Sequence, residues 1–207
     1  MLRNSNRKTT PKVKNGQVQK KNNHGWTEFE GLLDKEHFSF IKLKAEEGFT
    51  HVTERKAALD FVQLIPNWNI ISKGLTAIVL DGEGSSTQAG KCYSPNCYHS
   101  IWLPAFPKDM TLHWSKPFAK HHEVVVNMLG VEMHESEPGC FVTEWNRKQA
   151  QAWQLLHLFL YGLYCHQECM KQGKDNYHHK YELAEIYANT TANIMLSNYE
   201  KLIERFY

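Results

Sequence analysis

The spacing of apolar residues along the chain predicts a helix first and then several short strands. In residues 53–65 the apolar side chains recur at three- to four-residue intervals and Pro66 follows, which predicts an amphipathic helix. Residues 75–80, 99–103 and 110–114 are short apolar runs bounded by glycine, proline or polar residues, and they predict strands. The glycine-rich, acidic residues 81–84 predict a turn, followed by a loop to about residue 98.

The second half of the chain changes to helical spacing. Ser115 is a plausible N-cap and Pro117 fits the first turn of a helix that ends at Gly130. Residues 131–134 and 140–145 predict two further short strands around a Pro-Gly turn, and residues 146–170 and 177–207 predict two long helices. This order predicts an α+β fold, in which short strands form a small sheet and two long C-terminal helices follow.

The first 24 residues differ in composition from the rest. They hold seven basic and no acidic residues, no aromatic residue and four apolar ones. Such a segment buries too little apolar surface to offset the entropy of ordering, so we predict a disordered basic tail over residues 1–24 and a single domain over residues 25–207. A solubilising role for the tail is favoured, and nucleic acid bound through phosphate neutralisation is the alternative. The remaining residues carry 17 basic and 22 acidic side chains, which makes the domain mildly acidic.

Composition also bears on the compartment. No apolar stretch approaches the 18 or so residues that a membrane span needs, and the N-terminal sequence has no apolar core of a secretory signal. We therefore expect a cytoplasmic protein without a membrane association, whose five cysteines are reduced thiols.

Histidine and cysteine are the residues that invite a metal hypothesis. Two adjacent pairs, His121-His122 and His178-His179, are interpreted as solvated helix faces, because neighbours on a helix point in different directions. His122 also lacks a second histidine four residues later, so no zinc-protease helix begins there. Cys92 and Cys97 have the spacing of half a structural zinc site, which His99 and Cys140 would have to complete; buried free cysteines are the favoured interpretation.

One longer stretch carries a family resemblance. The run Trp-Gln-Leu-Leu-His-Leu-Phe-Leu at residues 153–160 resembles the approach to the zinc helix in an uncharacterised bacterial family of zincin-like proteins, where Q-L-L-H-V-x-L leads into H-E-L-G-H-H. Residues 100–107 and 182–188 are similar to other segments of that family, and the similarity covers roughly residues 50–205. The resemblance implies a zincin-like fold, with a zinc ion held by H-E-x-x-H and a third ligand on a later helix.

The chain departs from that family at the metal motif. Tyr161 stands where the first histidine ligand is expected, Gly162 replaces the general base, and Cys165 replaces the second ligand. A phenol with an ordinary pKa near 10 is a poor zinc ligand at neutral pH, and glycine cannot take a proton. Glu185 remains as the candidate third ligand. We therefore expect a catalytically inactive binding or regulatory module with an unknown protein partner and no resident cofactor.

A metal-dependent hydrolase with a changed ligand set is the alternative. Its metal residues would be Cys165, His166, Cys169 and Glu185, and zinc would suit that set. His157 and Cys165 lie eight residues apart, about 12 Å along a helix, and are not expected to share one ion. The competing interpretation, which we favour, is that Tyr161, Cys165 and their neighbours pack between the two C-terminal helices.

Overall fold

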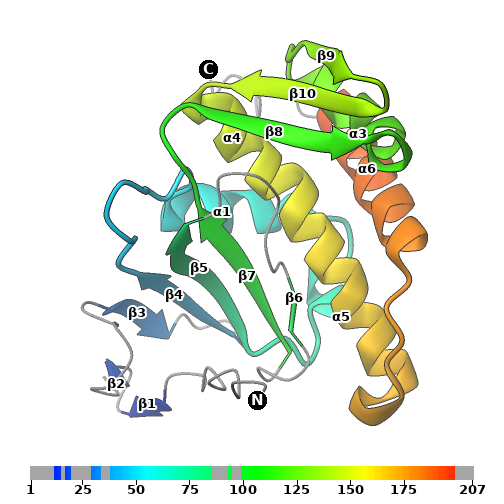
Figure 1. Cartoon of the computed structure of the whole chain (residues 1–207). Helices are drawn as coiled ribbons and strands as arrows, with labels where there is room; N and C mark the ends of the chain where they lie inside the picture. Colours follow the sequence, from blue (N-terminus) through cyan, green and yellow to red (C-terminus); the bar gives the residue numbers. More distant parts are fainter. Residues whose placement is uncertain are drawn as a thin grey trace, which may run out of the picture.

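The computed structural model describes residues 12–14, 17–19, 29–33, 38–84, 93–94 and 99–198. These residues form two principal sheets and a layer of helices, so the predicted α+β class is confirmed (Figure 1). Within residues 1–24 the structure describes only β1 (Lys12–Lys14) and β2 (Gln17–Gln19), which pair antiparallel with each other. The other residues of the predicted tail lie outside the described residues.

The larger sheet has five strands in the order β3-β4-β5-β7-β6. Its members are β3 (Phe29–Leu33), β4 (Ser39–Leu43), β5 (Ala77–Gly84), β6 (Tyr93–Ser94) and β7 (Ser100–Ala105). The three central strands, β4, β5 and β7, run parallel, and the two edge strands are antiparallel to their neighbours. Every residue of β7 is buried, as expected for a parallel strand covered on both faces.

The smaller sheet is antiparallel, in the order β8-β10-β9. It contains β8 (Met110–Ser115), β9 (Met133–Glu137) and β10 (Cys140–Trp145). The burial of β8 alternates along the strand, which is typical of a sheet with one covered and one solvated face.

The helices lie between and beside the two sheets (Figure 1). They are α1 (Arg55–Val62), α2 (Trp68–Ile71), α3 (Lys116–Met128), α4 (Arg147–Trp153), the π-helical segment η2 (Gln154–Phe159), α5 (Leu160–Gln172), the short 3-10 helix η3 (Lys174–Asn176) and α6 (Tyr181–Asn198). Figure 1 shows α4 and α5 as one long helix that crosses the molecule, with α6 returning beside it. α6 packs against both α5 and α3.

The long helix begins where the sequence predicts it. Asn146 caps α4, since its side chain accepts a hydrogen bond from the Gln149 backbone N–H while the Gln149 side chain accepts one from the Asn146 backbone N–H. The sequence did not predict the π-helical turns of η2 in its middle. Such turns widen the helix locally and occur often at functional sites.

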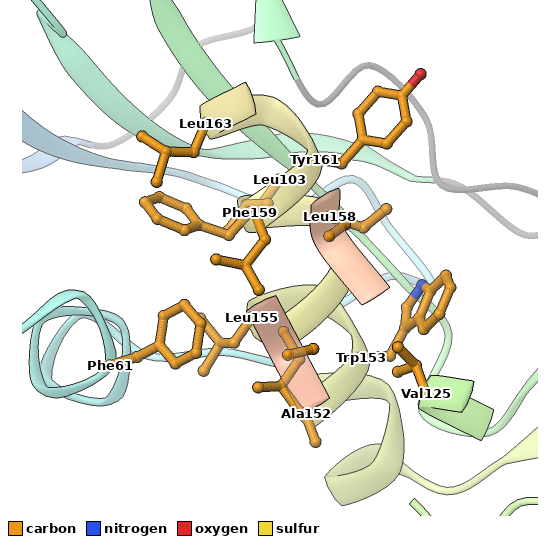
Figure 2. Close-up of a cluster of buried hydrophobic side chains, with 14 of the residues drawn as sticks. Phe61, Leu103, Val125, Ala152, Trp153, Leu155, Leu158, Phe159, Tyr161 and Leu163 are labelled. Carbon is orange, nitrogen blue, oxygen red and sulfur yellow. The ribbon is translucent and has the colours of Figure 1, made fainter. Parts of the chain in front are cut away.

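The long helix has two sides of different character. Figure 2 shows Leu155, Phe159 and Leu163 directed toward α1 and the larger sheet, where Phe61 meets Phe159 edge-on with ring centroids 5.9 Å apart. Trp153 lies on the other side, next to Val125 of α3, and Tyr161 lies on that side farther along the helix (Figure 2). The first side completes the main hydrophobic core, and the second side leads to the candidate site.

Some predicted boundaries are wrong. β5 continues through residues 81–84, where a turn was expected. The reason lies at Gly82: a side chain there would collide with the Lys44 carbonyl oxygen, so this glycine permits a close backbone approach within a strand. The predicted last helix starts at Tyr181 rather than residue 177, and its residues 199–207 lie outside the described residues.

Candidate metal centre

Three ligand-type side chains from three separate helical segments meet in the interior. His122 comes from α3, His157 from η2 and Glu185 from α6, and their ligand atoms all lie within 4.8 Å of one another. The three residues are only 3%, 1% and 2% exposed, respectively. In the part of the chain that the structure describes, this is the one group of three such side chains close enough to hold a metal ion.

The sequence places each ligand on the buried face of its helix. His122 lies three, four and seven residues before Val125, Val126 and Leu129, all buried, so it belongs to the apolar stripe of α3. Glu185 follows Ala184 on α6, whose other alanines, Ala188 and Ala192, are also fully buried. Their small side chains let α6 approach its neighbours closely, which brings the Glu185 carboxylate within reach of both imidazoles.

Tryptophans surround the two histidines. The Trp153 ring stacks on His157 at 4.1 Å with an angle of 4° between the planes. His122 packs against Trp114 at 4.0 Å and Trp153 at 4.9 Å. Trp145 meets Trp153 edge-on at 4.8 Å. This wall excludes water from the cluster, so charges within it interact more strongly than they would in solvent.

The separations between the ligand atoms fit a first-row metal ion after a small adjustment. His157 Nε2 lies 2.7 Å from Glu185 Oε2, which is a hydrogen bond, and His122 Nδ1 lies 3.7 Å from the same oxygen. Two ligand atoms held 2.0–2.1 Å from a tetrahedral zinc are about 3.3 Å apart. These two distances lie on either side of that value and every separation in the set is within 4.8 Å, so side-chain shifts of about 1 Å would admit the ion.

Binding an ion there would replace the His157–Glu185 hydrogen bond by bonds from both groups to the metal. His157 Nε2 and Glu185 share a proton in the hydrogen bond, and a cation needs both lone pairs free. An ion on Nε2 would leave the ring proton on Nδ1, the nitrogen that usually donates to an acceptor when a histidine binds a metal. The cluster would bind metal more weakly in acid, because protons compete with the ion for the lone pairs of the imidazoles and the carboxylate.

Several buried polar atoms beside the cluster have no hydrogen-bond partner among the described residues. They are Nδ1 of His157, Nε1 of Trp153 and Oδ1 of Asn189. Asn189 lies one helical turn after Glu185 on α6 and is 9% exposed. Buried polar atoms in folded proteins are nearly always paired, and exceptions concentrate where an ion or ordered solvent belongs. The donor set and these atoms together fit a metal centre.

Comparison with known proteins adds nothing to this geometry. The chain matches no protein-family model, and neither the curated proteins nor the solved structures contain a significant match. Within the described residues no helix has the length and apolar character to cross a membrane.

The structure separates most of the predicted metal residues. Of Cys165, His166, Cys169 and Glu185, only Glu185 belongs to the cluster. His166 Nε2 instead lies 3.0 Å from the Lys73 carbonyl oxygen, to which it donates a hydrogen bond. Cys165 and Cys169 are buried free thiols, and burial raises the pKa of the Cys165 thiol to about 12, which keeps it in the protonated form that binds metals poorly.

The other candidate residues have mixed outcomes. His122 is buried, so its assignment to a solvated face is wrong, whereas His178 and His179 are exposed as predicted. Cys92 and Cys97 lie outside the described residues, so the half-site hypothesis for that loop stays a prediction.

Sequence reasoning missed His122 and left His157 without its true partner. A signal for His122 was present, because its spacing from the valines of α3 puts it on the apolar face. His157 was set aside because it could not reach Cys165, yet it reaches Glu185 on the neighbouring helix. That contact joins residues 28 positions apart in the sequence, and no local pattern predicts it.

Proposed function

We propose that this protein binds one divalent transition-metal ion through His122, His157 and Glu185 and acts as a metal-dependent hydrolase. The observation that carries the proposal is the convergence of two imidazoles and one carboxylate, all buried, from three separate segments. Two histidines and one carboxylate are a recurrent protein ligand set for hydrolytic zinc, and they leave at least one coordination position for water or substrate.

The residues present support the metal-binding part of that role. A bound ion in this class of site polarises a substrate carbonyl or phosphoryl oxygen and lowers the pKa of water to about 7. Glu185 and the two histidines hold the ion, while the wall of tryptophans keeps other water away and strengthens the local field. The resemblance to zincin-like proteins agrees with a ligand set of two histidines and one glutamate. Of the three proposed ligands, Glu185 alone stands at a position where that family has a metal ligand.

A second candidate is the non-catalytic binding module. It is supported by the low exposure of all three ligands and by Gly162 and Tyr161 at the positions of the family's base and first ligand. In that case the His157–Glu185 hydrogen bond serves packing alone, and an unknown protein partner is the ligand. The basic residues near the N-terminus also make nucleic acid a candidate partner. Nucleic-acid binding that weakens as the salt concentration rises would support it.

Metal titration of the purified, untagged chain separates the candidates. We expect close to one equivalent of zinc or cobalt, and loss of that metal in Glu185→Gln, which preserves the size and hydrogen-bonding shape of the side chain. Glu182→Gln is the matched control, because Glu182 is exposed on the same helix. Less than about a tenth of an equivalent in the parent protein, or equal loss in both variants, contradicts a metal centre.

Activity is then measured on a panel of ester, phosphoester and peptide probes. Turnover that is abolished by a chelator, restored by zinc and missing in Glu185→Gln supports the hydrolase. Stoichiometric metal without turnover on any probe supports the binding module.

A further inference from the structure

A hydrogen-bonded chain leads from Tyr161, beside the metal centre, to an exposed histidine. The Tyr161 hydroxyl lies 2.5 Å from His179 Nε2, and His179 Nδ1 lies 3.0 Å from the Tyr177 hydroxyl. His179 is exposed and belongs to the connection between η3 and α6. Tyr161 itself is 8% exposed. The phenol thus stands between the buried ligands and an imidazole at the surface.

Tyr161 also lies against the metal ligands. It follows His157 by one helical turn, and the two rings have centroids 6.3 Å apart. Figure 2 shows the Tyr161 ring on the side of the long helix that carries Trp153, with its hydroxyl pointing away from the leucines and Phe159. Trp114 and Trp153 close the centre on the side of His122. Tyr161 is therefore a polar group that lies between the metal ligand His157 and the exposed His179.

The charge of the centre indicates which ligand would arrive. A divalent ion with neutral imidazoles and the single carboxylate of Glu185 leaves one unit of positive charge in a buried site. Burying such a charge is costly unless an anion accompanies it. A small oxyanion, such as a carboxylate, would neutralise the charge and accept a hydrogen bond.

One tautomer of His179 makes the Tyr161 hydroxyl that donor. Partial desolvation of the His179 ring lowers its pKa below the ordinary value, so the ring is neutral at pH 7. With its proton on Nδ1, toward Tyr177, the neutral imidazole accepts a hydrogen bond from Tyr161 at Nε2. The phenol is then the donor of the pair and can turn its O–H from His179 to an incoming anion.

We propose that Tyr161, positioned by His179, donates a hydrogen bond to a carboxylate-type anion that binds on the Tyr161 side of the His122–His157–Glu185 metal centre. The inference rests on the proposed function, because it needs the ion in place. Tyr161 touches the anion, whereas His179 acts only through Tyr161. The substrate class that follows is a compound bearing a carboxylate or a similar oxyanion.

The test uses acetate as the probe on the full chain loaded with cobalt, whose visible absorption reports a new ligand. Cobalt affinity is measured first for every variant, so failure of the metal centre is seen separately from failure of anion binding. Tyr161→Phe should bind cobalt as the parent does but bind acetate about tenfold more weakly or worse, because a hydrogen bond to a charged acceptor is lost.

Substitutions of His179 test whether this residue positions the Tyr161 hydroxyl. His179→Ala should weaken acetate binding several-fold, and His179→Gln, whose amide oxygen can accept from Tyr161 as Nε2 does, should restore most of it. His178→Ala is the matched control, because His178 is the exposed neighbour, and it should leave the acetate Kd unchanged.

Each contrary result is decisive. Equal acetate affinity in Tyr161→Phe and the parent overturns the inference, as does a parent that binds cobalt but no acetate. Failure of His179→Gln to improve on His179→Ala overturns the positioning role. If the parent protein binds no cobalt, both the proposed metal centre and the role of Tyr161 are refuted.

Discussion

Replacing His166 by glutamine should flatten the pH dependence of stability. His166 is fully buried and donates from Nε2 to the Lys73 carbonyl oxygen, and burial lowers its pKa from 6.5 to about 4. The folded protein thus holds a neutral ring, whereas the unfolded chain takes up a proton near pH 6.5. This contribution to stability is complete above pH 6.5 and is lost as the pH falls toward 4. Between pH 7 and pH 5 the loss comes to about 2 kcal/mol.

Urea unfolding at pH 7 and pH 5 measures the effect. The parent protein should lose about 2 kcal/mol more of its free energy of unfolding over that interval than His166→Gln, whose side chain cannot titrate. His178→Gln should behave as the parent, because His178 is exposed. If His166→Gln loses as much as the parent, the buried neutral imidazole is not the cause. Metal content should be the same in His166→Gln and the parent, because His166 lies outside the cluster.

Two further predictions concern close packing and thiol chemistry. Gly82→Ala should lower the free energy of unfolding by about 1–3 kcal/mol, because the new methyl meets the Lys44 carbonyl oxygen. Gly139→Ala is the control, because Gly139 has open space around it but a φ of +80°, and it should lower the free energy of unfolding by about 1 kcal/mol. Thermal unfolding compares the two variants. An equal decrease in stability in both would refute the steric explanation for Gly82. The Cys165 thiol, with its pKa raised to about 12, should resist alkylation at pH 8 in the native protein, while the partly exposed Cys140 reacts. Mass mapping that finds Cys165 modified as fast as Cys140 contradicts this.

The elements that sequence reasoning predicted correctly are those whose signals are local. Ser115 and Pro117 mark the start of α3, and the capping residues Asn146 and Gln149 mark the start of α4. At α4 the Asn146 side chain satisfies a backbone donor of the first turn, whereas at α3 Ser115 makes no capping hydrogen bond and Pro117 simply lacks a donor. The fold class was predicted correctly for the same reason. Local signals give the order of helices and strands along the chain, and that order is enough to predict an α+β fold.

The site could be predicted only in part, because its residues are joined by tertiary contacts. Glu185 was predicted as a ligand from its place on the last helix, and it does lie in the cluster. His122 was misassigned because adjacent histidines were weighed as a pair, although each neighbour on a helix faces a different environment. The choice between Cys165 and His157 as a partner for Glu185 depends on how α6 lies against the long helix, and short-range periodicity does not contain that information.

The π-helical segment η2 has a consequence for how this site could change during evolution. Its turns accommodate more residues than α-helical turns do, so deleting one residue from 154–159 could return the segment to a regular α-helix without breaking it. Because a π-helical turn holds about one residue more than an α-helical turn over the same rotation, the residues on either side of the deletion would keep the directions in which they face. Trp153 before η2 and Leu163 after it would then retain their neighbours, and only the side chains within residues 154–159 would have to repack. The extra residue could therefore be gained or lost in one step, with its effects confined to the turn that carries His157.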